Sequence, residues 1–179
     1  ARSLPALCAC QPHAPGPGPV DHTHQCPVSQ PELRSHHQRC LWEQNDASKQ
    51  QWGWATRLAT AAVDRYGLLE NRVVYLGERP DDDPSLIDER STVENMSAAL
   101  RGMAAEAGPQ DRVLIVLIGH GTGQGEDVEF NLPGPDLTPR ELEEMLEVFP
   151  TQTVAVVNTS PSSGPFIPVL SGPNRVVLT

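Results

Sequence analysis

A run of six apolar residues, Val113–Ile118, constrains the fold of this chain more than any other feature. Every position is Val, Leu or Ile, so both faces of an extended segment would need to be buried. That is typical of a central parallel strand with helices on both sides. Thr153–Val157 has a similar character, and Arg175–Thr179 begins a further β-rich run. These segments predict a parallel sheet enclosed between helices.

Helical segments alternate with the strands. Ser48–Gln51 and Ser91–Glu94 fit capping boxes, and Thr138–Glu141 opens a third helix with proline in its first turn. The expected buried faces are Trp54, Leu58, Ala61 and Ala62, then Val93, Met96, Leu100 and Met103, and finally Leu142, Met145, Leu146 and Phe149. This alternation predicts right-handed βαβ crossovers and a three-layer, doubly wound, mostly parallel α/β sheet.

The composition changes along the chain. All four cysteines and five of the six histidines lie before residue 41, among many prolines. Residues 1–52 carry equal numbers of acidic and basic side chains, so the net charge of −10 belongs to residues 53–179. The first segment shows neither helical nor strand periodicity. We therefore expect residues 1–47 to be disordered or non-homologous, and residues 48–179 to form one α/β domain.

Charge and hydropathy exclude several classes of function. A net charge of −10 and a pI near 4.9 argue against binding to a nucleic-acid backbone. No apolar stretch is long enough to cross a membrane, and the first residues lack the pattern of an export signal. We expect a soluble protein, whose compartment and oligomeric state the sequence leaves open.

Functional groups in such sheets lie just past the carboxyl ends of the strands, which here are the loops 119–127 and 158–164. The glycines of the first loop match neither the dinucleotide fingerprint nor the Walker pattern, and no Gly-x-Ser-x-Gly elbow is present. We therefore expect no cofactor. What remains is His120, the only histidine after residue 40, and a small-polar turn that contains Ser160. A nucleophile beside a histidine is a pattern of acyl-transfer chemistry.

These two strand ends resemble those of the caspase-like fold, shared by caspases, legumains, gingipains and separases. The matching residues are the strand before Gly119-His120-Gly121 and the strand before Asn158-Thr159-Ser160. The segments 130–138 and 162–166 also look like those of uncharacterised bacterial caspase-like proteins. The resemblance covers about residues 52–179 and implies a relative of the clan CD cysteine peptidases that takes a peptide or protein as substrate or partner.

In that family, a histidine is the general acid/base and a cysteine is the nucleophile. The resemblance assigns these positions to His120 and Ser160, the oxyanion-binding N–H groups to Gly121 and Ser160, and supporting places to Gly119, Asn158 and Thr159. No cysteine follows Cys40. A serine hydroxyl is a weak nucleophile unless a base lies within roughly 2.6–3.2 Å. We therefore expect a pseudoenzyme, a peptidase-like domain that is inactive or incomplete.

Two alternatives remain open. One is a serine-using peptidase or hydrolase with a His120/Ser160 dyad, in which Glu126 or Asp127 orients the histidine. The other is a small-ligand-binding α/β module. The family's sheet begins with a central strand before its first helix, and the sequence suggests none before Ser48. We therefore expect an incomplete fold that lacks this strand and the segments that follow residue 179 in the family.

Cysteines and histidines cluster near the N-terminus. They are Cys8, Cys10, His22, His24, Cys26, His36, His37 and Cys40. Their spacings match no common zinc finger, so we expect no metal site, with zinc binding as the alternative. The acidic loop from Glu78 to Arg90 fits a solvated face, or a place that receives basic side chains of a substrate.

Overall fold

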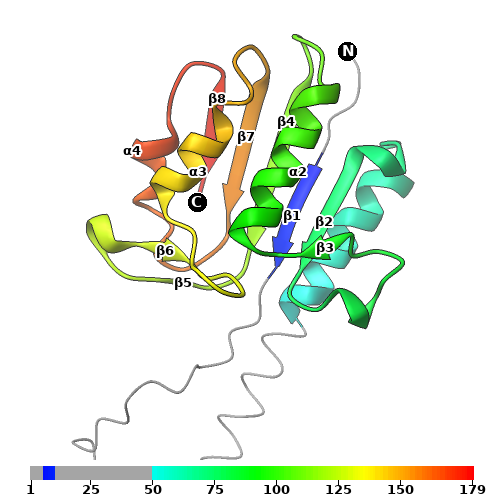
Figure 1. The fold of residues 1–179 in the computed structure, drawn as a ribbon, viewed down its shortest axis with the longest axis horizontal. Helices are drawn as coiled ribbons and strands as arrows, with labels where there is room; N and C mark the ends of the chain where they lie inside the picture. The colour runs from blue at the N-terminus through cyan, green and yellow to red at the C-terminus, as the bar shows by residue number, and fades with distance from the viewer. Residues whose placement is uncertain (1–5, 11–49) are drawn as a thin grey trace, which may run out of the picture.

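Six parallel strands form the central sheet, in the order β3-β2-β1-β4-β7-β8 (Figure 1). The structure, a computed structural model, describes residues 6–10 and 50–179. The strands are β1 (Ala6–Cys10), β2 (Val73–Gly77), β3 (Glu89–Arg90), β4 (Arg112–Ile118), β7 (Thr153–Asn158) and β8 (Arg175–Leu178). The predicted α/β class with a parallel sheet is confirmed.

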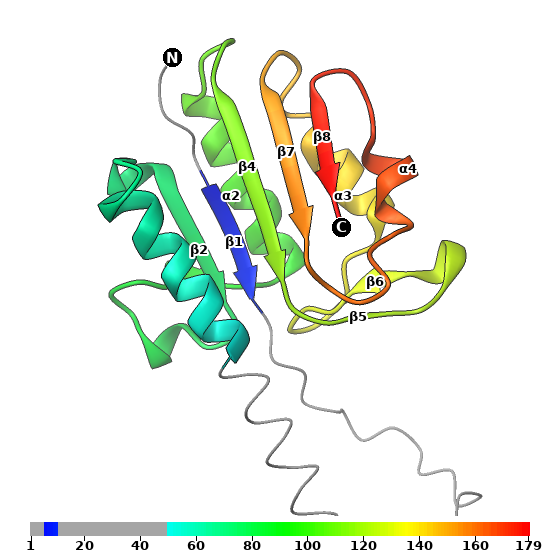
Figure 2. The same ribbon diagram turned by 180° about the vertical axis from the view of Figure 1, so that it is seen from behind.

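Helices cover the two faces unequally. The first described helix, residues 50–64, packs on one face, where Ala55 and Ala59 join Tyr75 and Ile118 in a buried cluster. On the opposite face lie α2 (Val93–Glu106), α3 (Pro139–Leu146) and α4 (Phe166–Leu170). Figure 2 shows the first face, with the helix of residues 50–64 in front of β2. In the described part of the chain, no helix has the length and apolarity needed to cross a membrane.

The first central strand lies where none was expected. Ala6–Cys10 forms β1, which pairs in parallel with β2 along one edge and with β4 along the other. Its five residues are only Ala, Leu and Cys, which are small or only weakly favour β-strands. The sequence therefore contained no clear indication of a strand within this Pro-rich segment. The expectations that residues 1–47 take no part in the fold and that this strand is missing are therefore wrong for residues 6–10. The remaining residues of that segment lie outside the described residues.

Some details of the predicted helices differ. Trp54 was expected on the buried face of the first helix, but its side chain is half exposed, and Gln51, Ala55, Ala59 and Ala62 are buried there. The predicted capping box at Ser91–Glu94 is wrong by one residue, because Thr92 is the N-cap of α2 and its side chain accepts a hydrogen bond from the Asn95 N–H. The helix predicted to begin at Thr138 is α3, with its proline in the first turn as expected, and a capping box between Thr138 and Glu141 that was not predicted.

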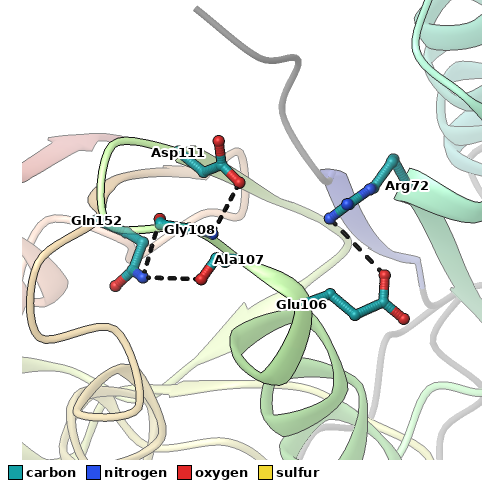
Figure 3. A network of polar contacts seen from close by, with 6 residues as sticks. All are labelled: Arg72, Glu106, Ala107, Gly108, Asp111 and Gln152. Carbon is teal, nitrogen blue, oxygen red and sulfur yellow. Dashed lines mark hydrogen bonds and ion pairs between the residues drawn. The ribbon is translucent and has the colours of Figure 1, made fainter.

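The connections at the amino end of the sheet fix the register of β4 against β7. The side-chain amide of Gln152 donates hydrogen bonds to the carbonyls of Ala107 and Gly108, and Asp111 accepts one from the Gly108 N–H (Figure 3). These contacts tie the end of α2 to the start of β7. With Arg112 opposite Thr153, the strands run in step until Leu117 lies opposite Asn158 at the carboxyl edge.

Candidate functional site at the carboxyl edge

The two predicted segments lie side by side at the carboxyl edge of the sheet. Thr159 joins them, because its backbone N–H and its hydroxyl both donate to the carbonyl oxygen of Leu117, at 2.9 and 3.0 Å. Beyond Leu117 the chain continues to Gly119 and His120, and beyond Thr159 it reaches Ser160. The adjacency of these segments, which the parallel sheet predicted, is therefore present.

Ser160 is held by the side chain of Asn158. The amide oxygen of Asn158 accepts hydrogen bonds from the Ser160 N–H at 3.0 Å and from its hydroxyl at 2.8 Å. Both residues are buried, with 1% of Asn158 and 6% of Ser160 exposed. A serine hydroxyl has a single proton to donate. While that proton is directed at Asn158, it is not directed at His120.

Gly121 packs directly against the serine loop. A β-carbon at this position would lie 2.9 Å from Ser160 Oγ and 2.6 Å from the carbonyl oxygen of Pro161. These distances are shorter than real contacts of a β-carbon allow. Glycine is therefore required for the two loops to approach this closely, and it places the backbone next to His120 beside the serine hydroxyl.

His120 is half-buried, and its Nε2 lies 3.3 Å from the side-chain Nε2 of Gln51. With this orientation of the amide, Gln51 donates, and the imidazole Nε2 is the acceptor. Sequence reasoning missed Gln51, although it lies four and eight residues before Ala55 and Ala59 on the buried face of its helix. A polar residue among the apolar residues of the buried helix face is the sequence feature that could have identified Gln51.

Glu126 and Asp127, expected to orient His120 in a serine hydrolase, lie in the short 3-10 helix Gly125–Asp127. Both side chains are exposed. They line a separate cavity, together with Arg140 of α3 and Val169 of α4. These carboxylates therefore face a different cavity and do not line the His120–Ser160 site.

Three residues that hydrogen-bond to His120 or Ser160 each leave one buried side-chain amide atom without a hydrogen-bond partner among the described residues. These atoms are Gln51 Oε1, Asn131 Oδ1 and Asn158 Nδ2. Asn131 adjoins the site through its backbone, whose N–H donates to the carbonyl of His120 at 3.0 Å. A buried polar atom without a partner costs about 1–3 kcal/mol, so such atoms are rare in ordinary cores.

Glu78 follows the end of β2 at the same edge of the sheet. Burial raises the pKa of its carboxyl group above the ordinary value of 4.5, and the neighbouring Arg79 and Arg90 offset part of that rise. This carboxylate lies in the loop that was expected to be a solvated acidic face. At least one of its acidic groups is therefore partly withdrawn from water.

Metal ligands do not gather at this edge. Within residues 50–179, no group of three or more His, Cys, Asp or Glu side chains is placed to hold a metal ion. The N-terminal Cys/His cluster lies outside the described residues, apart from the backbone of Cys8 and Cys10 in β1.

Comparison with known proteins adds no relative: no protein-family model matches the chain, and no curated protein matches it.

Proposed function

We propose that this chain is a caspase-like, peptidase-related domain in which the histidine–serine pair is catalytically silent, and that it acts by binding a peptide or protein partner. The observation that carries the proposal is the double hydrogen bond from Ser160 to Asn158 Oδ1. It occupies the N–H that would stabilise an oxyanion and the proton that a base would have to remove.

The topology supports the caspase-like part of the proposal. A central strand, β1, precedes the first described helix, as the family resemblance implies. His120 and Ser160 follow two adjacent parallel strands, which is where that family carries its catalytic residues. The partnerless amide atoms of residues that hydrogen-bond to them support a functional edge, since ordinary cores satisfy such groups.

A serine-using hydrolase is the second candidate. It is favoured by the contact between Gly121 and Ser160, which brings the hydroxyl beside the backbone next to His120. For this function, Ser160 must exchange its bond to Asn158 for one to the imidazole. The partial burial of His120 beside Gln51 argues for the silent site.

Peptide hydrolysis distinguishes the two candidates. The wild-type chain, Ser160→Cys and His120→Ala are incubated with a mixed peptide library, and the products are identified by mass spectrometry. We expect no cleavage by the wild type. Cleavage by the wild type that disappears in His120→Ala would overturn the silent site, and cleavage by Ser160→Cys alone would show that the domain lacks only its nucleophile.

A further inference from the structure

A groove of about 400 Å³ runs between α2 and the outer edge of β2, away from the carboxyl-edge site. Its floor is apolar and is formed by Val74 and Leu76 of β2 with Ala99 and Met103 of α2. Volumes of this size are typical of ligand sites. None of the residues of the His120–Ser160 site lines it.

Small side chains on α2 create this space. Ala98, Ala99 and Gly102 face the groove, where larger residues would fill it. A β-carbon at Gly102 would have no atom within 4 Å, so nothing in the fold requires glycine there. Glycine inside a helix costs roughly 0.5–1 kcal/mol relative to alanine. The groove is therefore kept open at a position where filling it would stabilise the helix.

The rim of the groove is acidic. Asp88, Glu89 and Glu106 line it, against one cationic lining residue, Arg72. Arg72 Nη1 lies 3.7 Å from Glu106 Oε2. Figure 3 shows this ion pair. The Asp88 carboxylate is fixed at the strand edge, because one of its oxygens accepts from the Tyr75 N–H at 2.8 Å. Asp88 and Glu89 are left without a cation among the lining residues.

The adjoining edge of β2 is already engaged. The Val73 N–H donates to the carbonyl of Glu70, the Tyr75 N–H donates to Asp88, and the Tyr75 carbonyl accepts from the Asp88 N–H. A ligand in the groove would therefore be held by the apolar floor and the acidic rim, not by strand pairing.

We propose that this groove binds a peptide segment in which an apolar residue precedes a cationic one. The apolar side chain occupies the floor over Ala99 and Met103, and the cation lies between Asp88 and Glu89. An amphipathic cation fits both the apolar floor and the excess of negative charge at the rim.

The test is a titration of the full-length, ¹⁵N-labelled chain with acetyl-Leu-Arg-amide, followed by NMR. The matched probe is acetyl-Leu-citrulline-amide, which has the same shape without the charge. We expect the arginine peptide to shift the amide signals of Glu89, Ala99 and Gly102, and to bind at least about threefold more tightly than the citrulline peptide, as one or two exposed charge pairs allow.

Two variants locate the site. Gly102→Leu fills the groove and should abolish the shifts, whereas Ala105→Leu, on an exposed position of α2 that does not line the groove, should leave them unchanged. Glu89→Gln should weaken binding of the arginine peptide about threefold. This variant still tests the proposal if Gly102→Leu does not fold. Equal binding of the two peptides, shifts confined to other residues, or an unchanged affinity in Glu89→Gln would overturn the proposal.

Discussion

The side-chain oxygen of Asn158 accepts hydrogen bonds from both the backbone N–H and the hydroxyl of Ser160. One residue thus holds the two groups that a serine peptidase would need to keep available. The bond spans two positions, from the last residue of β7 into the loop, as Asx turns do. The position where the resemblance assigns a nucleophile is therefore filled by a serine with a structural role.

Removing Asn158 should destabilise the fold more than removing the serine hydroxyl. In Asn158→Ala, two buried donors of Ser160 lose their acceptor, which we expect to cost about 1–3 kcal/mol. Ser160→Ala leaves the backbone bond in place and should cost about 1 kcal/mol. Urea denaturation measures both. A larger loss in Ser160→Ala than in Asn158→Ala would contradict this role of Asn158.

Two glycine-to-alanine substitutions should change the stability of the fold in opposite directions. Gly121→Ala places a β-carbon against the backbone of Pro161 and Glu129, so we expect a loss of about 1–3 kcal/mol. Gly102→Ala meets no neighbouring atom within 4 Å and lies inside α2, so we expect a gain of roughly 0.5–1 kcal/mol. Thermal unfolding of both variants is the measurement, and a stable Gly121→Ala would show that the two loops do not lie in contact.

Glu78 should make stability depend on pH. Burial raises the pKa of its carboxyl in the folded protein above 4.5, so the folded state binds this proton more tightly than the unfolded state. Ionised Glu78 therefore costs stability at neutral pH, and this cost vanishes as the pH falls below 4.5. We expect Glu78→Gln to be more stable than the wild type near pH 7, with the advantage lost in acid. Urea titrations across this range would contradict the assignment if the advantage grew at low pH.

The central position of β1 can be tested at Ala9. A proline there removes a backbone donor from a strand that pairs on both edges, so we expect Ala9→Pro to lose cooperative unfolding. Ala9→Gly keeps the N–H and should cost about 1 kcal/mol or less. Circular dichroism during heating distinguishes them. If Ala9→Pro unfolds at the temperature of the wild type, residues 6–10 do not form a central strand.

Much of the sheet was predictable because its strands have strong local signals. Val113–Ile118 is apolar throughout and forms β4, and Thr153–Val157 forms most of β7. The proline that follows Thr138 indicated the start of α3. By contrast, β1 is short and rich in Ala and Cys, and its stability comes from pairing with β2 and β4. Such tertiary pairing leaves no periodic pattern in five residues.

The site was predictable only in outline. Parallel strands bring their carboxyl ends together, so the proximity of His120 and Ser160 could be predicted from the parallel sheet. The acceptor to which the serine hydroxyl donates depends on side-chain rotamers, which the sequence does not specify. Asn158 was therefore expected only as a supporting residue. The contact between Gln51 and His120 joins residues 69 positions apart. No local pattern specifies such a pair.

Labelling with a fluorophosphonate probe tests the silent site most directly, because the probe reacts with an activated serine hydroxyl and not with an ordinary one. The wild-type chain is exposed to the probe and analysed by intact-mass spectrometry, with Ser160→Ala as the control. With the Ser160 proton donated to Asn158 Oδ1, we expect no mass increase in either protein. Labelling of the wild type at Ser160 that is absent from Ser160→Ala would contradict a catalytically silent domain.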